Sequence, residues 1–160
     1  MQKIIVLFGV SGCGKSTIGK RLSEDLQFQF IEGDHFHTND NINKMKKKIP
    51  LDDLDRKLWL DNINAEIKSL ERKNIVLACS ALKEKYRKRL IKAIDADIFW
   101  FCLKGNLNQI KERLEKRKNH FFSSDMLQSQ FDIIEYPDYC TFIDIKYKPQ
   151  VIVDLIKSKL

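Results

Sequence analysis

A glycine-rich stretch near the amino terminus, GVSGCGKST at residues 9–17, carries the residue types that bind phosphate. Glycines let backbone N–H groups wrap around phosphate oxygens, the Lys15 ammonium can reach the β- and γ-phosphates, and the Ser16 hydroxyl can bind Mg²⁺. The stretch fits G-x-x-x-x-G-K-[ST] at every fixed position, follows an apolar run and opens a segment of helical period. A plain strand-to-helix turn is the alternative. We predict a nucleoside triphosphate site made of Gly9, Val10, Ser11, Gly12, Cys13, Gly14, Lys15, Ser16 and Thr17.

A second group of polar residues, EGDHFH at 32–37, follows the next apolar run. We expect the carboxyl end of that run to lie beside the γ-phosphate, because it is the strand after the phosphate loop. A carboxylate there could accept the proton of a hydroxyl nucleophile or hold waters of Mg²⁺. Such an acidic loop is also an ordinary helix cap or turn. The phosphate loop alone does not distinguish a kinase from an ATPase, a GTPase or a nucleotide-driven switch. The residues that would bind a phosphoryl acceptor have to distinguish these classes.

These motifs need a scaffold that brings them to one edge. Apolar runs at 3–9, 28–32, 74–79, 98–103 and 141–145 predict strands, and their near-continuous hydrophobicity is typical of strands covered on both faces. Helical period appears in between, as in Trp59, Ile63, Ile67 and Leu70. The alternation predicts an α/β fold: a P-loop NTPase-type three-layer sandwich, with about five parallel strands and helices on both faces. Ligands are then expected beyond the carboxyl ends of the strands.

Composition limits the classes of function. The chain has 160 residues, with 29 Lys and Arg against 22 Asp and Glu, a formal charge of +7. That excess could serve nucleic acid or anionic small molecules, but a solvated lysine-rich surface explains it as well. No apolar run approaches the roughly 18 residues that span a membrane, and no signal peptide is evident, so we expect a cytoplasmic protein. Four cysteines show neither metal-ligand spacing nor support for disulfides. We expect one domain over 1–160.

Four blocks of the chain, in order, resemble the gluconate kinases (gluconokinases) of the small P-loop type, which are relatives of shikimate and adenylate kinases. The blocks are GVSGCGKST, EGDHFHTNDNINKMKKKIPLDDLDRKLWL, CSALKEKYRKRL and LKGNLNQIKERLEKRKNHFFSSDMLQSQFDIIEYP. The first block is generic, whereas the other three are specific in combination. The resemblance covers residues 9–137 and implies ATP- and Mg²⁺-dependent phosphorylation of D-gluconate at its 6-hydroxyl, in a homodimer. No nucleic-acid or membrane partner is expected.

The resemblance also implies roles for individual acceptor-side residues. Asp34 falls on the aspartate that meets the reacting hydroxyl, as base or orienter. His37 falls on the motif histidine near the sugar acid, with simple packing under a loop as the alternative. Arg56 could meet the gluconate carboxylate through two parallel hydrogen bonds, or could form a surface ion pair with Asp52 or Asp53.

Further basic residues follow in the third and fourth blocks. Ser80 would let a polyol approach the backbone, while Lys83 and Arg87 share one helix face that could meet anionic ligands or solvent. A substrate flap is implied at about 35–60 and a mobile lid at about 117–127. Arg113 and Arg117 would hang from that lid over ATP, although Arg113 could instead pair with Glu112 or Glu115.

The expected site is therefore complete in outline. The catalytic residues are Lys15, Asp34 and Arg117; the nucleotide is bound by residues 9–17, Arg113 and Arg117; the substrate is bound by Asp34, His37, Arg56, Ser80, Lys83, Arg87 and His120; and Mg²⁺ is bound by Ser16, with Glu32 acting through water. Three departures from the family pattern affect the metal, flap and lid: Glu32 replaces Asp, and Lys48 and Asn119 replace glycines.

Two other functions stay open. A shikimate-type kinase is the first, although its arginine-rich acceptor site is not evident after Phe121. A nucleotide-dependent RNA-binding module is the second, suggested by lysine clusters at 44–48 and 83–89 that lack interleaved aromatic residues.

Overall fold

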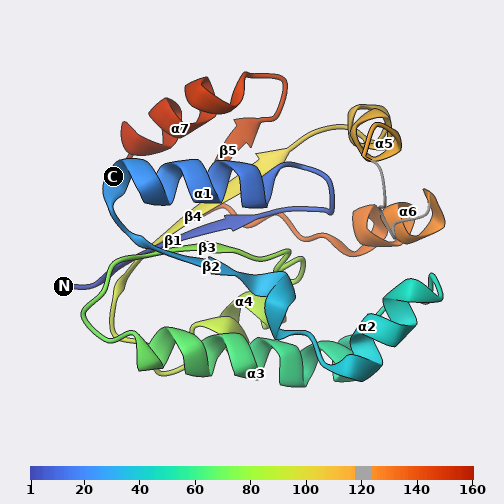
Figure 1. The fold of residues 1–160 in the computed structure, drawn as a ribbon, viewed down its shortest axis with the longest axis horizontal. Helices are drawn as coiled ribbons and strands as arrows, with labels where there is room; N and C mark the ends of the chain where they lie inside the picture. The colour runs from blue at the N-terminus through green and yellow to red at the C-terminus, as the bar shows by residue number, and fades with distance from the viewer. Residues whose placement is uncertain (118–123) are drawn as a thin grey trace.

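The computed structural model describes residues 1–117 and 124–160. Within them, five parallel strands form one sheet in the order β2-β3-β1-β4-β5. Helices α1 and α7 cover one face, and α3 and α4 cover the other (Figure 1). This arrangement confirms the predicted three-layer α/β sandwich. The strands are β1 (Lys3–Phe8), β2 (Gln29–Glu32), β3 (Ile75–Ala78), β4 (Asp97–Lys104) and β5 (Thr141–Asp144), and the covering helices are α1 (Lys15–Leu26), α3 (Asp53–Ser69), α4 (Glu84–Leu90) and α7 (Pro149–Lys157).

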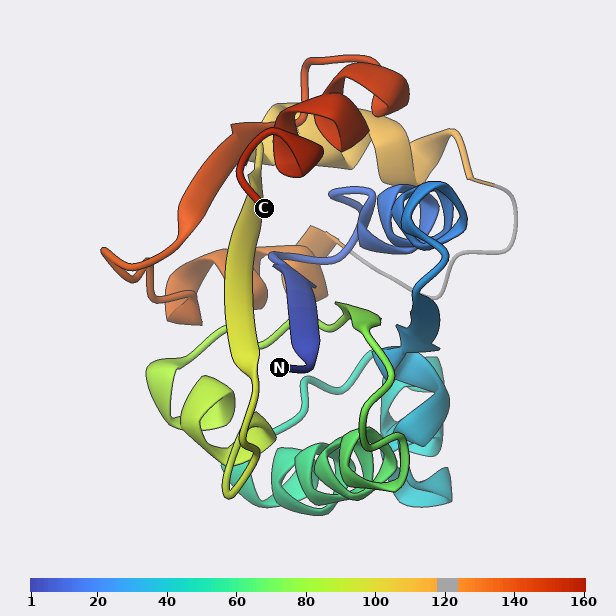
Figure 2. The same ribbon diagram turned by 90° about the vertical axis from the view of Figure 1, so that its left-hand side faces the viewer.

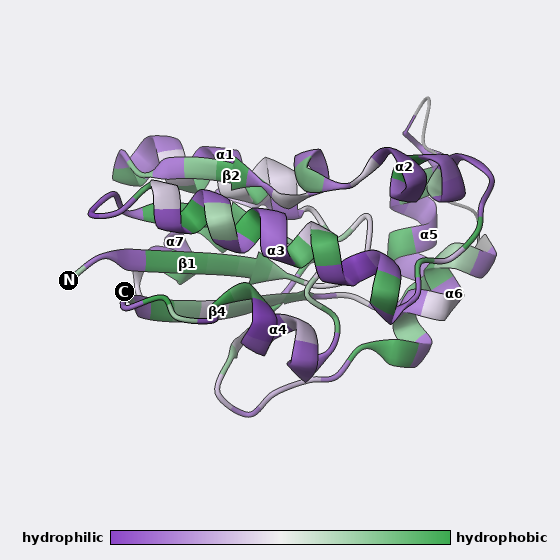
Figure 3. Cartoon of the chain, turned by 90° about the horizontal axis from the view of Figure 1, so that it is seen from below, coloured by the Kyte–Doolittle hydropathy of each residue, from purple (hydrophilic) through white to green (hydrophobic). Residues whose placement is uncertain are grey.

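The central strand β1 explains the apolar run that precedes the phosphate loop. Its five residues from Ile4 to Phe8 are 0% exposed, because helices lie over both faces and β3 and β4 flank its edges. The hydropathy colouring shows β1 hydrophobic along almost its whole length (Figure 3). A strand fixed on four sides is a rigid support for the loop that follows it.

The second strand of the sequence is not next to the first in the sheet. β3 lies between β1 and β2, so the end of β2 is separated from the phosphate loop by one strand. The segment after β2 has to cross the end of β3 to reach the loop. That crossing is made by a 3₁₀ turn, η1 (Gly33–Phe36), which carries Asp34.

Shorter helices gather at the carboxyl edge of the sheet, to the right in Figure 1. Figure 2 shows the molecule from the opposite side, where both chain termini lie. The threonine hydroxyl of Thr38 caps the first of them, α2, by accepting from the Asn41 backbone N–H at 3.2 Å. A reciprocal capping box of Asp52 and Asp55 starts α3. None of the described helices is long and apolar enough to cross a membrane. The helices at this edge are α2 (Asn39–Lys46), α5 (Leu107–Glu115) and α6 (Ser124–Ile133).

Gly33 allows η1 to lie against the end of β3. A Cβ atom there would be 2.6 Å from the Ala78 carbonyl oxygen and 3.2 Å from the Cys79 Cβ, so backbone would have to move. We therefore expect Gly33→Ala to lower the free energy of unfolding by about 1–3 kcal/mol and to reduce kcat by displacing Asp34. Urea denaturation and steady-state kinetics measure the two effects. Wild-type values for both would show that the close approach has no such importance.

Candidate active site

The phosphate loop joins β1 to the amino-terminal end of α1. Gly12 and Gly14 have φ angles of +82° and +101°, which favour glycine, and a Cβ atom on Gly12 would meet the Leu114 side chain at 2.9 Å. The first N–H groups of α1 are unpaired within the helix and add a positive field at its start. The Lys15 Nζ donates to the Gly9 and Val10 carbonyl oxygens at 3.0 and 2.9 Å, so the ammonium group lies within the loop.

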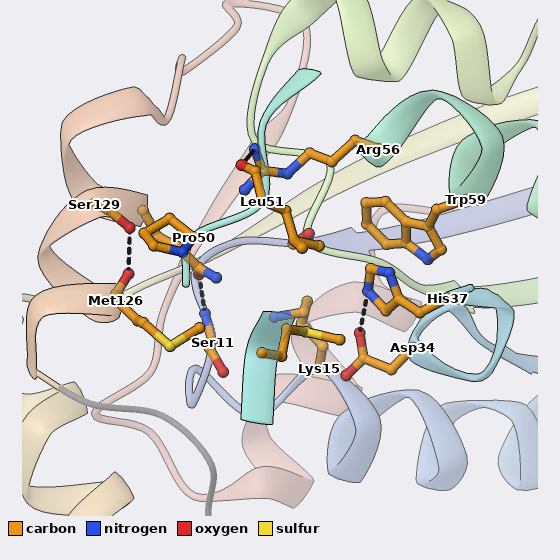
Figure 4. Close-up of a pocket in the computed structure, with 13 residues that line it drawn as sticks. Ser11, Lys15, Asp34, His37, Pro50, Leu51, Arg56, Trp59, Met126 and Ser129 are labelled. Carbon is orange, nitrogen blue, oxygen red and sulfur yellow. Dashed lines mark hydrogen bonds and ion pairs between the residues drawn. The ribbon is translucent and has the colours of Figure 1, made fainter. Parts of the chain in front are cut away.

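One pocket collects most of the residues predicted for the acceptor side (Figure 4). They come from the phosphate loop, η1, α3 and the end of β3, so the pocket lies beyond the carboxyl ends of the strands. The Asp34 side chain is 75% exposed, which leaves its carboxylate open to a ligand. The Gly9 N–H donates to the Ser80 carbonyl oxygen and ties the loop to β3. The predicted residues in the pocket are Ser11, Lys15, Asp34, His37, Arg56 and Ser80, and Met45, Pro50 and Leu51 of the expected flap join them.

His37 is both packed and part of the pocket wall. Its side chain is 6% exposed and stacks on Trp59, with ring centroids 4.3 Å apart and planes 14° from parallel. Trp59, which belongs to the helical stripe seen in the sequence, is 1% exposed, yet its indole also lines the pocket and donates to the Gly33 carbonyl oxygen at 2.8 Å. Burial lowers the pKa of His37, although the Asp34 carboxylate opposes that shift. The lowered pKa favours the neutral imidazole at neutral pH.

Arg56 is 8% exposed and makes neither of the surface ion pairs considered from the sequence. Its Nη1 donates to the Leu51 carbonyl oxygen and to the Tyr86 hydroxyl, the latter at 3.3 Å. Tyr86 in turn donates to Asp53, and burial together with this carboxylate raises the pKa of Tyr86 to about 12. These contacts fix one side of the guanidinium, while Arg56 also lines the pocket and can take a carboxylate there.

Known proteins resemble this chain over most of its length. A family described as an AAA domain matches residues 5–123. A protein named "Probable gluconokinase" from Dictyostelium discoideum is 41% identical, covering 98% of this chain and 86% of that protein. A "Gluconokinase" from Arabidopsis thaliana is 38% identical, covering 96% and 90%. The chain belongs to the gluconokinase family.

The solved structure of a gluconokinase from Sinorhizobium meliloti superposes on this chain with a TM-score of 0.86 at 36% identity, covering 95% of this chain and 87% of that one. A shikimate kinase from Acinetobacter baumannii has the same fold, with a TM-score of 0.62, at only 18% identity. This chain is therefore similar to the gluconokinase in both fold and sequence, and to the shikimate kinase in fold alone.

Two residues expected to bind the substrate lie away from the gluconokinase pocket. Lys83 pairs with Asp53 at 3.3 Å and lines an adjacent depression that shares Arg56 with the main pocket. Arg87 was also expected to bind the substrate, but its side chain is 1% exposed. It donates to the Ala81 carbonyl oxygen at 2.8 Å and to the Tyr139 hydroxyl at 3.0 Å. The guanidinium supports the segment between β3 and α4 and does not line the pocket.

The arginines expected on the lid differ in position. Arg113 lies in α5, where it donates to the carbonyl oxygens of Cys13, at 3.5 Å, and Ile145, and forms no ion pair with Glu112 or Glu115. It therefore anchors α5 against the phosphate loop. Arg117 is exposed and is the last residue described before the gap. His120, Asn119 and most of the expected lid lie outside the described residues.

The two residues expected at Mg²⁺ come from separate elements, Ser16 from the first turn of α1 and Glu32 from the end of β2. In the described part of the chain, no group of three or more His, Cys, Asp or Glu side chains could hold a metal ion. Mg²⁺ in phosphoryl-transfer sites commonly binds one or two protein oxygens, with phosphate and water supplying the rest. A hydroxyl and one carboxylate fit that pattern.

Helix α6 contributes a wall of the pocket that sequence reasoning missed, made of Met126, Ser129 and Gln130. The Gln130 Oε1 accepts from the Ser11 backbone N–H at 2.7 Å, a link between residues 119 positions apart. Because that N–H can only donate, the atom of the Gln130 carboxamide that it meets is the oxygen, and the amide nitrogen is not used in this contact. The only signal was the SQF sequence in the fourth block, which has no distinctive chemistry of its own.

Proposed function

We propose that the protein transfers the γ-phosphoryl group of ATP to the 6-hydroxyl of D-gluconate. The observation that carries the proposal is the convergence of the phosphate loop, the Asp34 carboxylate and the Arg56 guanidinium on one pocket. Figure 4 places Asp34 and Arg56 on different sides of that pocket. A linear polyol acid fits such a site, with its carboxylate at Arg56 and its terminal hydroxyl at Asp34.

In the proposed reaction, Asp34 orients the hydroxyl and takes its proton, while Lys15 and the loop N–H groups stabilise charge on the phosphate oxygens. Arg117 would add positive charge at the transferring group when the segment at about 117–127 closes and excludes water. Mg²⁺, held by Ser16 and through water by Glu32, would neutralise phosphate charge. These roles for Arg117 and the metal residues are part of the proposal.

The protein's setting also belongs to the proposal: a single-domain cytoplasmic homodimer with no nucleic-acid partner. Ion pairs within the lysine clusters support the last point, because Lys44 binds Asp55 at 2.7 Å, and Lys83 and Lys85 both bind Asp53. Those ammonium groups are already partly neutralised by carboxylates, which lowers their attraction for a phosphate backbone.

A coupled assay of ADP release tests the function directly. We expect ATP consumption to depend on added D-gluconate, with much lower rates for shikimate and for no acceptor. A preference for shikimate would show that the protein is a shikimate-type kinase. Turnover that is equal with and without acceptor would make it an ATPase.

Arg56→Lys tests the carboxylate site. Lysine keeps the charge but loses the planar pair of donors and the contact to Tyr86, so we expect KM for gluconate to rise about 10- to 100-fold, corresponding to the roughly 1.5–3 kcal/mol of a charged hydrogen bond. KM for ATP should stay near the wild-type value. Arg72→Lys, at an exposed position, is the matched control. A rise in KM for ATP alone would contradict the assignment.

A further inference from the structure

Asn41 is a buried polar residue on α2, 2% exposed, and is not among the residues predicted to bind or catalyse. Its Nδ2 donates to the Asp55 carbonyl oxygen at 2.9 Å and lies 3.3 Å from the His37 Nδ1. Because a carbonyl oxygen can only accept a hydrogen bond, Asp55 fixes which end of the Asn41 carboxamide points this way. The amide nitrogen, with its two hydrogens, serves both partners.

This orientation determines the protonation of His37. One hydrogen of the amide goes to Asp55, so the other points at the His37 Nδ1, which has to accept it. A neutral imidazole that accepts at Nδ1 carries its own hydrogen on Nε2. The Nε2 atom lies 3.9 Å from the Asp34 Oδ1, on the side that lines the pocket (Figure 4).

We propose that Asn41 is a positioning residue that holds His37 as the neutral Nε2–H tautomer, so that this N–H donates to the acceptor hydroxyl whose proton Asp34 takes. The inference rests on the proposed phosphoryl transfer for its last step. It assigns Asn41 a role in catalysis through His37, without contact between Asn41 and the substrate.

The distance between His37 and Asp34 suits a bridging hydroxyl. At 3.9 Å, Nε2 and Oδ1 are too far apart for a direct hydrogen bond, but one oxygen about 2.8 Å from each fits between them. That hydroxyl accepts from Nε2–H and donates to Asp34, which leaves its second lone pair for the γ-phosphorus. As the new O–P bond forms, the bond from phosphorus to the leaving ADP oxygen breaks and the proton passes to Asp34.

The surroundings of His37 favour the same neutral state. The charged groups that face it are Asp34 from η1 and Arg56 from α3, with Lys15 of α1 on the same pocket, while Trp59 is uncharged. Burial and Arg56 lower the pKa of His37, against Asp34. A protonated imidazole would also direct Nδ1–H at the amide hydrogens of Asn41, two donors facing each other.

A spectrum of the wild-type protein tests the tautomer without any activity measurement. Two-bond ¹H–¹⁵N correlation separates protonated from unprotonated ring nitrogens, and the chain has three histidines, so His35→Gln and His120→Gln complete the assignment. We expect Nε2 protonated, Nδ1 unprotonated and the titration of His37 below its usual midpoint. A protonated Nδ1 at neutral pH would overturn the proposal, even if gluconate is phosphorylated.

Asn41→Asp tests the consequence for the reaction. Its carboxylate would accept from Nδ1–H, so His37 should stay protonated to higher pH or change tautomer. We expect kcat at neutral pH to fall about 10²-fold, the usual effect of losing one fixed donor, and the acid limb of the pH–rate profile to move to higher pH. Asn43→Asp, which adds the same charge at an exposed position on α2, should keep the wild-type profile.

An Asn41→Asp protein that keeps the wild-type tautomer and the wild-type pH–rate profile would overturn the proposal. Where this variant does not fold, the wild-type spectrum decides. The two failures are distinguishable, since a protein that shows the Nε2–H tautomer but does not phosphorylate gluconate would refute the proposed function and leave the role of Asn41 toward His37 in place.

Discussion

Lys15→Ala is expected to lower kcat by about 10²–10³-fold, the effect typical of removing one fixed charged donor from a phosphoryl-transfer site. The ammonium group already lies within the loop, bonded to Gly9 and Val10 at 3.0 and 2.9 Å. Phosphate oxygens would accept hydrogen bonds from the same ammonium group. Its removal therefore takes away stabilisation of the negative charge that develops in the transition state. Steady-state kinetics at saturating ATP and gluconate measure the effect.

Lys20→Ala is the matched control for this variant, because Lys20 lies on the same helix but is exposed. It should retain wild-type kcat, and both proteins should show wild-type circular dichroism. A Lys15→Ala enzyme with near wild-type turnover would mean that the glycine-rich loop does not hold the transferring phosphate.

Asp34→Asn should lower kcat by about 10²–10⁴-fold, the range for loss of a general base, while the Kd for ATP stays near the wild-type value. Asparagine has nearly the same shape, but it cannot accept the hydroxyl proton as a base. The 75% exposure of the Asp34 side chain indicates that few protein contacts are lost with the charge. Kinetics and calorimetric titration with ATP separate the two quantities.

Asp40→Asn removes a carboxylate from an exposed position on α2 and should change neither quantity. If Asp34→Asn weakened ATP binding as much as turnover, Asp34 would belong to the nucleotide site. Equal activity of the Asp34→Asn and wild-type enzymes would remove it from the catalytic role.

The strands could be predicted because burial leaves a direct mark on the sequence. A strand such as β1, covered on both faces, has to be apolar at consecutive positions, and Ile4 to Phe8 are. The phosphate loop could be predicted for a similar reason, since glycine at positive φ, lysine and serine are each required by local geometry. Both signals lie within a few neighbouring residues.

The parts that could not be predicted depend on contacts between distant segments. Helix α2 lacks an apolar stripe, and its Ile42 is exposed. The helix is held instead by the buried Asn41 and by its Thr38 cap. The placement of β3 beside β1, and the hydrogen bond from Ser11 to Gln130, are likewise products of the folded chain. A residue type alone does not say whether an arginine faces a ligand or, as with Arg87, a backbone carbonyl.

Lys48 adopts a backbone conformation that favours glycine. Its φ angle is +59°, in the left-handed region. A side chain in that region costs about 1–2 kcal/mol, so the turn before Pro50 carries local strain. Pro50 and Leu51, which follow this turn, line the pocket.

The central claim is that the phosphate loop and Asp34 act on one hydroxyl. A crystal structure with D-gluconate and a non-hydrolysable ATP analogue tests it most directly. We predict an Asp34 carboxylate oxygen about 2.6–3.2 Å from the 6-hydroxyl oxygen, with that oxygen in line with the γ-phosphorus and the gluconate carboxylate at Arg56. A complex in which the 6-hydroxyl meets another side chain, with Asp34 turned toward solvent, would contradict the account.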